Sequence, residues 1–322
     1  MKRFLAFLLC LLMLFSLCAC TGAGEEKPEK TEAPTPTPSE EPEEAECTPL
    51  MYKATDGKGG VLYILGSIHV ADDRAKDMPD YVTDAYDESD YLCVECDTFA
   101  FNSDMAAQRE LAELVVYSDG SKISDHISAE TYEAAKAILE ENGLYSYVYD
   151  YMKPAMWVSA LETLSAEKAG LDSDSGIDLM FLKKAHKSGL EIREIESVEF
   201  QFNMLIGFSD ELMDAMLASD CSEDAAESSL ELYELWLKGN EKALIKALTA
   251  EDDSDSDIPA ELLEEYNKAM ISDRNIGMAD KAEEYLAGGG TGFYIVGLAH
   301  VIGDGGIIDL LTQRGYTVEK IS

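Results

Sequence analysis

The sequence has few basic residues. Lys and Arg number 25 against 64 Asp and Glu, and the formal net charge is −39. A chain of this charge is repelled by phosphate backbones and by anionic lipid, so we expect no nucleic acid partner. Cations and cationic or neutral substrates are compatible with this negative charge. The charge alone does not identify a ligand.

Long apolar runs are also scarce, and the one at the start of the sequence is the candidate for a membrane-directed segment. Residues 1–19 begin with Lys2 and Arg3, continue through an apolar run of signal-peptide length and end before Cys20. The segment from Leu17 to Cys20 resembles the bacterial lipobox, so we expect Cys20 to be acylated and to hold the chain on the extracytoplasmic face of the cell membrane. The alternatives are a plain cleaved signal with an unmodified Cys20, and an uncleaved transmembrane helix, for which the run is short.

Residues 20–46 are almost without apolar side chains, and prolines alternate there with Thr and Ser. Such a segment cannot bury enough surface to offset the entropy of ordering it, so it predicts a disordered linker. The folded domain is then expected to span residues 47–322, which is long enough for a sizeable core.

Cysteines are few once the signal is set aside. The domain keeps Cys47, Cys93, Cys96 and Cys221. An exported chain with an even number of cysteines permits disulfides, but the sequence does not give their pairing. Residues three apart on a strand point to opposite faces, so Cys93 and Cys96 are interpreted as buried structural residues.

Strand and helix patterns alternate at both ends of the domain, and a helix-rich region lies between them. A start signal at Ser128, Pro154 near a helix beginning and a terminating Gly189 mark helices in the middle. The pattern predicts an α/β fold in which the two ends share one sheet. The expected order is a hairpin over 50–70, a helix over 78–90, a strand over 91–97, helices over 104–169, a helix and strand over 177–196, acidic helices over 197–286, and a strand, helix and strand over 292–321.

Histidine is scarce, with four residues in the chain, and two of them share one context. The motif Gly-x-x-His ends the apolar runs VLYILGSIHV and GFYIVGLAHV, which places His69 and His300 after matching strands. His126 and His186 lie in stretches typical of loop and helix surface. Because ligands gather at the carboxyl ends of strands in α/β sheets, the matched pair predicts a shared site.

Glu95 ends the intervening strand and would reach the same sheet edge as His69 and His300. Two imidazoles and a carboxylate can coordinate a divalent transition metal, whose bound water becomes acidic enough to attack a carbonyl. Glu95 could instead be the general base. Gly66 and Gly297 would let the backbone approach a ligand closely. A single histidine at a strand end is more often a hydrogen-bonded core residue, so the prediction depends on the repeated context.

The ordered set of segments GSIHV, VECD, GIDLMFLKKA, IESVEFQF, SDRNIGMADKAEEYL and IVGLAHVIGDGGIIDLL resembles the TraB/PrgY/GumN family, whose eukaryotic relatives are the TIKI metalloproteases. The resemblance implies that His69, His300 and Glu95 are the catalytic and metal-binding set. It also implies a manganese- or cobalt-dependent peptidase, and a fold similar to the erythromycin esterase and ChaN-like proteins, with two α/β repeats around a mixed sheet.

Further residues have open roles. Arg274 and Asn275 match a family motif and could bring a cation or an amide to the site, although Arg274 could equally pair with an acid. Asp178 suits a helix N-terminus. Glu196 and Gln201 could line the pocket or cap the helix that begins near Ser197. A Cys96 that faced the site would favour zinc, but alternation along the strand argues against it.

The sequence therefore predicts a lipid-anchored metal-dependent hydrolase that acts on peptides or proteins. The alternative is a binding lipoprotein that sequesters a peptide signal, a metal or haem without turnover, and a purely structural envelope lipoprotein is a third reading.

Overall fold

The computed structural model describes residues 47–249 and 258–321. The expected signal at 1–19, the acylation site Cys20 and the linker up to residue 46 lie outside the described residues. Within the described ranges, no helix is both long enough and apolar enough to cross a membrane.

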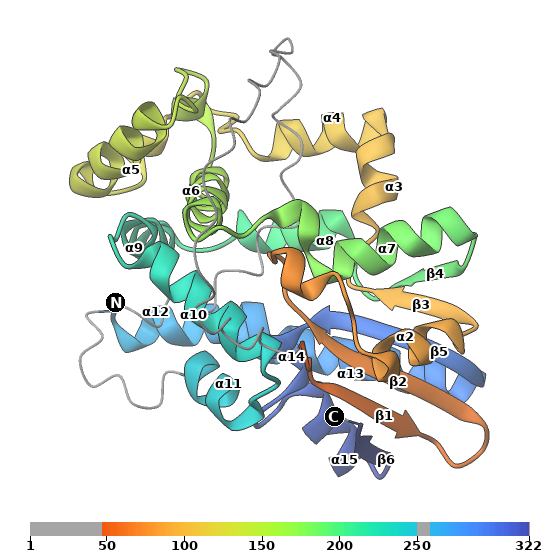
Figure 1. The fold of residues 1–322 in the computed structure, drawn as a ribbon. Coiled ribbons are helices and arrows are strands. Elements are labelled where there is room, and N and C mark those ends of the chain that lie inside the picture. Colours follow the sequence, from red (N-terminus) through yellow and green to blue (C-terminus); the bar gives the residue numbers. More distant parts are fainter. Residues whose placement is uncertain (1–46, 250–257, 322) are drawn as a thin grey trace, which may run out of the picture.

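A single six-stranded mixed sheet organises the fold, in the order β4-β3-β5-β2-β1-β6 (Figure 1). The four strands β4, β3, β5 and β2 are parallel, whereas β1 pairs antiparallel with both β2 and β6. The predicted mixed α/β fold is confirmed. The strands span β1 Met51–Thr55, β2 Gly60–Ser67, β3 Tyr91–Val94, β4 Glu191–Glu194, β5 Gly290–Gly297 and β6 Thr317–Lys320.

The two ends of the domain meet in the centre of the sheet. Strand β2 pairs in parallel with β5 over its whole length, from Gly60 opposite Gly290 to Ser67 opposite Gly297. The expected long-range pairing is therefore confirmed. It brings the two Gly-x-x-His segments onto neighbouring strands that run in the same direction.

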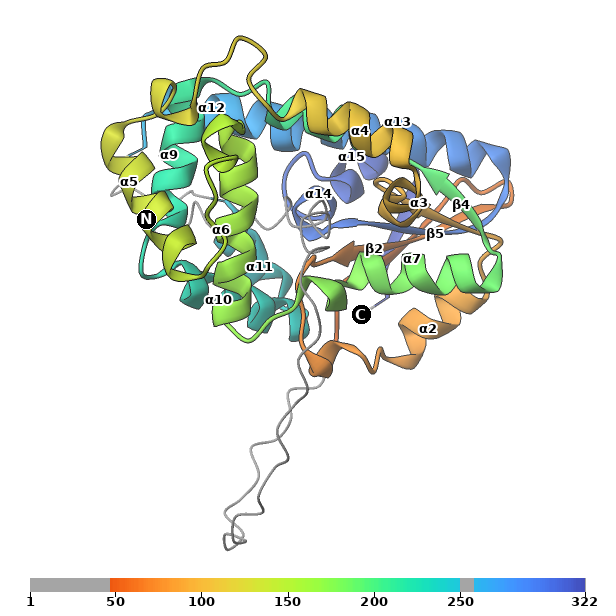
Figure 2. The ribbon, with the colours of Figure 1, turned by 90° about the horizontal axis from the view of Figure 1, so that it is seen from above.

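Helices cover both faces of the sheet (Figure 2). Helices α2 (Asp80–Asp87) and α7 (Ile177–Ser188) lie on one face, and α13 (Asp273–Gly288) lies on the other with α15 (Ile307–Gln313) beside it. The buried strand residues Leu62, Ile64 and Phe293 belong to the hydrophobic core between these layers.

A second hydrophobic cluster lies in a lobe of helices beside the sheet, and we call this region the helical lobe. Fully buried Trp157 packs there against Tyr132, Tyr145 and Tyr149. The helices whose side chains form this cluster include α4 (Met105–Leu114), α5 (Ala129–Glu141), α6 (Pro154–Lys168), α8 (Val198–Leu205), α9 (Asp210–Asp220) and α12 (Ala260–Tyr266). Helices α10 (Ala225–Leu237) and α11 (Glu241–Leu248) lie beside them in the lobe, but most of their buried side chains belong to the core at the sheet.

The predicted helix signals occupy the expected positions. The Ser128 hydroxyl accepts from the backbone N–H of Thr131 and caps α5, Pro154 is the first residue of α6, and Gly189 ends α7 with a φ of 74°. Each satisfies a terminal backbone requirement, which is why local sequence predicts these boundaries well.

The four cysteines of the described domain are free thiols, and Cys93 and Cys96 are buried as predicted. Burial raises the pKa of the Cys47 thiol to about 11. It also raises the pKa of Cys93 and of Cys96. These thiols therefore stay protonated near neutral pH, which makes them poor metal ligands.

Candidate functional site

Three neighbouring parallel strands deliver the predicted residues to one edge of the sheet. His69 follows β2, Glu95 follows β3, and His300 lies in α14 (Leu298–Val301) directly after β5. Because β5 lies between β3 and β2, all three residues emerge side by side at the carboxyl ends of the strands. Figure 2 shows α14 between the sheet and the helical lobe.

The three side chains converge at Gly297. A Cβ atom added to this glycine would lie 3.4 Å from Glu95 Oε1, 3.6 Å from His300 Cδ2 and 3.7 Å from His69 Nε2. Gly297 therefore leaves open the space between them. The structure brings together the two histidines and the carboxylate that the sequence predicts.

The His69 ring is oriented by the first turn of α7. Gly176 packs so tightly there that an added Cβ would lie 2.5 Å from the His69 carbonyl oxygen, and the N–H of Ile177 donates to the Ile68 carbonyl at 3.0 Å. This contact places Asp178, whose Oδ1 accepts from His69 Nδ1–H at 2.9 Å. Asp178 is thus both a helix N-terminal acid and the partner of a site histidine.

The His300 ring is oriented by α13. Its Nδ1–H donates to Asn275 Oδ1 at 2.7 Å, and Asn275 Nδ2 donates to the Gly305 carbonyl at 2.9 Å. Burial and the neighbouring Arg274 lower the pKa of His300 to about 3, so the ring is neutral at pH 7. Its Nε2 is buried and has no hydrogen-bond partner among the described residues.

Both oxygens of Glu95 accept hydrogen bonds. Oε1 accepts from the Gly297 N–H at 2.7 Å, and Oε2 accepts from Arg274 Nη2 at 2.6 Å and Gln201 Nε2 at 3.0 Å. Burial alone would raise the pKa of Glu95, but Arg274, His300, His69 and the Gly297 N–H outweigh it and lower the pKa to about 2. Glu95 is therefore a buried carboxylate anion.

Arg274 binds two acids at once. Besides Glu95, its Nε and Nη2 donate to the two oxygens of Glu196, each at 2.9 Å. Gln201 in α8 (Val198–Leu205) joins the same network, because its Nε2 also donates to Glu196 Oε2 at 2.9 Å. Of the two readings left open by the sequence, the structure shows the ion-paired arginine, and it pairs with the site itself.

A π-helical segment precedes Arg274. Six residues of π-helix, η6 (Asn267–Ser272), join α12 to α13 and widen the helix immediately before Arg274 and Asn275. π-Helical segments change the register of the residues that follow and are frequent at functional sites. Here Arg274 reaches Glu95, and the next residue, Asn275, reaches His300.

The two predicted pocket glycines differ. At Gly66 an added Cβ would lie 2.5 Å from Leu298 Cδ1 and 3.2 Å from Leu298 Cα. Gly66 therefore allows the close approach of Leu298, which follows β5, whereas Gly297 faces the three site residues. The Gly66 carbonyl also accepts from Trp236 Nε1 at 2.9 Å, which ties α10 of the helical lobe to this segment.

Cys96 lies next to the network without reaching Glu95. Strand β3 ends at Val94, so the alternation that placed Cys96 on the opposite face does not continue through it. Its thiol contacts Gln201 Oε1 at 3.5 Å. The two remaining histidines are engaged elsewhere: His126 Nδ1 lies 2.9 Å from Asp210, and His186 Nε2 lies 2.8 Å from Asp97.

Comparison with known proteins identifies the family of the chain. The model of the TraB/PrgY/gumN family matches residues 50–320, which is most of the chain. The chain belongs to this family. It is also 22% identical over 253 residues to the uncharacterized protein YbaP of Escherichia coli K12, an alignment that covers 77% of this chain and 87% of YbaP. YbaP of Shigella flexneri matches with the same identity and coverage. No solved structure matches significantly.

His69 and His300 of this chain suit a metal ion well. An acceptor at each Nδ1 fixes the tautomer in which Nε2 carries the lone pair, as is usual for metal-binding histidines, and His300 is neutral as ligation requires. Glu95 fits less well, because both oxygens already accept hydrogen bonds. Within residues 47–249 and 258–321, no group of three or more His, Cys, Asp or Glu side chains is arranged to hold a metal ion.

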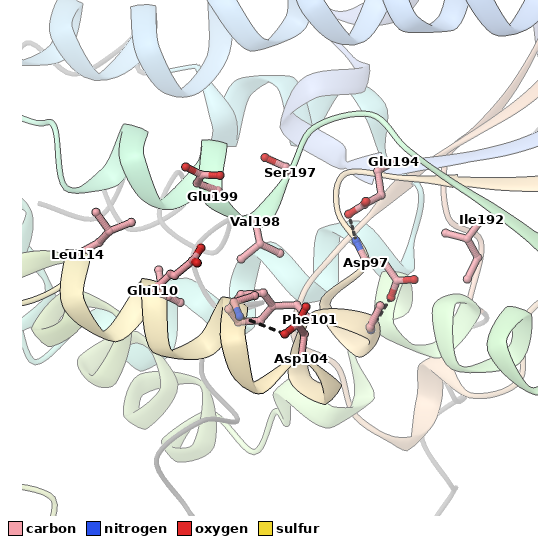
Figure 3. A pocket seen from close by; sticks show the side chains of 13 residues that line it. Asp97, Phe101, Asp104, Glu110, Leu114, Ile192, Glu194, Ser197, Val198 and Glu199 are labelled. Carbon is pink, nitrogen blue, oxygen red and sulfur yellow. Dashed lines mark hydrogen bonds between the residues drawn. The ribbon is translucent and has the colours of Figure 1, made fainter.

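A cavity of about 390 Å³ opens beside the site, between α3 (Thr98–Ser103), α4, β4 and α8 (Figure 3). None of the three converging residues lines it. Its wall includes Asp97, two residues after Glu95, and Ser197, which follows Glu196. The sequence does not indicate this cavity, because its residues come from four separate segments.

Proposed function

We propose that this protein is a metal-dependent hydrolase that cleaves peptide bonds. His69 and His300 are the metal ligands, and Glu95 is either a third ligand or the general base. The observation that carries the proposal is the convergence of the three side chains on Gly297. The orientation of each imidazole by a partner at Nδ1 supports it, because this arrangement leaves Nε2 to bind an ion.

A manganese, cobalt or zinc ion held there would acidify a water molecule and polarise a substrate carbonyl. The chain's own residues prepare the position. Asp178 and Asn275 hold the two rings, and the Asp178 carboxylate raises the basicity of His69 as a metal ligand. Glu95 keeps about one unused lone-pair position after its three hydrogen bonds, which can serve a metal ion or a proton.

Arg274 acts in this proposal as a positioning residue. Its bonds to Glu95 and Glu196 fix the Glu95 carboxylate and compensate its charge in a buried environment. We assign Gln201 the same task, because it donates to both carboxylates.

We further propose that Cys20 is acylated and that the domain acts on the extracytoplasmic face of the membrane. The sequence from Leu17 to Cys20 supports this proposal. The finer description of the fold as two repeats, similar to the erythromycin esterase and ChaN-like proteins, is supported by the matching strand, glycine and histidine of β2 and β5.

The test is turnover by the full chain in detergent, loaded with manganese, cobalt or zinc and given a mixture of short peptides. Wild type should cleave some of them, and Glu95→Gln should lower the rate by about 10²- to 10⁴-fold. Glu133→Gln, on the exposed face of α5, is the control and should keep full activity.

Peptide binding measured in parallel separates the hydrolase from a sequestering protein. Glu95→Gln should bind peptide about as well as wild type, which also shows that it folds. Peptide binding by wild type without turnover under any metal would contradict the hydrolase and support the binding lipoprotein.

A further inference from the structure

The cavity beside the site combines an apolar wall with carboxylates. Its apolar side chains include Phe101, Leu111, Leu114, Ile192 and Val198. Carboxylates come from both sides of the cavity, including Glu110 on α4 and Glu199 on α8, the two helices that face each other in Figure 3. No Lys, Arg or His lines it.

Some of the carboxylates have structural tasks and others do not. Asp104 caps α4 by accepting from the N–H groups of Ala106 and Ala107, and Glu194 accepts from the N–H of Asp97. Glu110 and Glu199 are exposed and have no hydrogen-bond or ion-pair partner among the described residues. These two carboxylates are therefore available to a ligand.

The cavity is connected to the site through the backbone. Its walls begin at the β3–α3 and β4–α8 connections. Glu95 lies in the first of these connections and Glu196 in the second. The two connections are joined by the Glu196 N–H, which donates to the Glu95 carbonyl at 2.8 Å. The cavity therefore begins within two residues of Glu95 along the chain, although none of the three converging side chains lines it.

We propose that this cavity binds a segment of the peptide substrate in which an apolar residue stands next to a lysine or arginine. The inference rests on the proposed function and adds a substrate class to it. The apolar side chain would pack against Phe101 and Leu111, and the cationic group would lie between Glu110 and Glu199. The volume of about 390 Å³ lies in the range of about 300–1,000 Å³ that is usual for ligand pockets.

Charge complementarity selects this occupant. An acidic peptide or an anionic lipid headgroup would meet carboxylates with no cation in the lining to compensate them. A small polyamine would satisfy the charges but leave the apolar wall exposed to water. A cationic and apolar peptide satisfies both.

The test measures binding of a coumarin-labelled hexapeptide of alternating leucine and lysine to full-length Glu95→Gln, which is used so that the probe is not consumed. Two control peptides carry glutamine in place of lysine, or alanine in place of leucine. We expect the leucine–lysine peptide to bind tightest and its affinity to fall as salt is raised.

The double variant Glu110→Gln/Glu199→Gln in the same background should bind this peptide about five- to tenfold more weakly, because two partly solvated ion pairs are lost. Its matched control is Glu133→Gln/Glu141→Gln on α5, which changes the net charge equally at exposed positions and should bind as before. Equal weakening in both double variants, equal binding of all three peptides, or displacement of the probe by spermidine as effectively as by unlabelled peptide would overturn the inference.

The outcomes also separate this inference from the proposed function. Selective binding without cleavage of any peptide by wild type would refute the hydrolase and leave the cavity assignment standing. Cleavage of peptides with no preference for the leucine–lysine sequence would refute the cavity assignment alone.

Discussion

The two Gly-x-x-His segments have the same pattern in sequence but different surroundings in the fold. His69 donates to a carboxylate, Asp178, whereas His300 donates to a neutral amide, Asn275, and lies near Arg274. One ring therefore lies beside a negative charge, and the other is held neutral. A repeated motif can thus supply two chemically different imidazoles, because the motif fixes the backbone position and distant residues fix the electrostatics.

The largest expected effect comes from removing the positive charge of Arg274, which lies near His300. Arg274→Met would leave Glu95 and Glu196 buried without their cation, at a cost of about 3–5 kcal/mol in the free energy of unfolding. Urea denaturation of the full chain measures this cost. Arg314→Met is the control, since Arg314 pairs with Asp280 and Glu283 in a more exposed position and should lose about 0–1 kcal/mol. Equal losses of unfolding free energy in the two variants would show that the buried network contributes no more than an exposed ion pair.

The contrast between the rings also predicts a pH dependence. Because the pKa of His300 falls from 6.5 to about 3 on folding, the unfolded chain binds the proton first, and stability is lost as pH falls below 6.5. Between pH 6.5 and 4.5 this contributes about 2 kcal/mol. Glu95, with a pKa of about 2, adds to the loss below pH 4.5.

Urea denaturation of chelator-treated protein at several pH values measures this dependence. His300→Asn removes the titrating ring and should flatten the stability profile between pH 6.5 and 4.5. An unchanged slope in the variant would show that His300 is not held neutral by the fold.

The two glycines should respond differently to the same added methyl group. Gly66→Ala forces a Cβ against Leu298 and should lower the free energy of unfolding by about 1–3 kcal/mol. Gly297→Ala meets only ordinary contact distances of 3.4–3.7 Å, so it should keep its thermal stability while the methyl group fills the space between the site residues and stops turnover. Thermal melting and peptide cleavage, measured on both variants, test the distinction; loss of stability in Gly297→Ala with full activity would refute it.

The smallest expected effect comes from making the two histidine partners alike. Asp178→Asn keeps an oxygen that can accept from His69 but removes the charge, and should lower turnover about tenfold with little change in melting temperature. Full activity in this variant would mean that the difference between carboxylate and amide partners has no functional role.

Local features of the fold could be predicted from the sequence. The hairpin of β1 and β2, the cap at Ser128 and the end of α7 at Gly189 depend on neighbouring residues in the chain. The convergence of His69, Glu95 and His300 was also predictable, because parallel strands place their carboxyl ends together.

The supporting contacts could not be predicted in the same way. Asp178 is recognisable as a helix N-terminal acid, but its bond to His69 depends on how α7 packs against a loop 109 residues away. The role of Gly66 depends on Leu298, which comes close only when β2 pairs with β5. A single sequence does not specify such contacts between distant segments.

The most direct test of the shared site is the metal content of the full chain purified in detergent without chelator, for wild type and for His69→Ala, His300→Ala and the double variant. We expect about one transition metal ion per wild-type chain and its loss in each single variant, because both Nε2 atoms are needed to hold it. Wild type that stays metal-free even after loading with manganese, cobalt or zinc, or variants that retain the ion, would contradict the account.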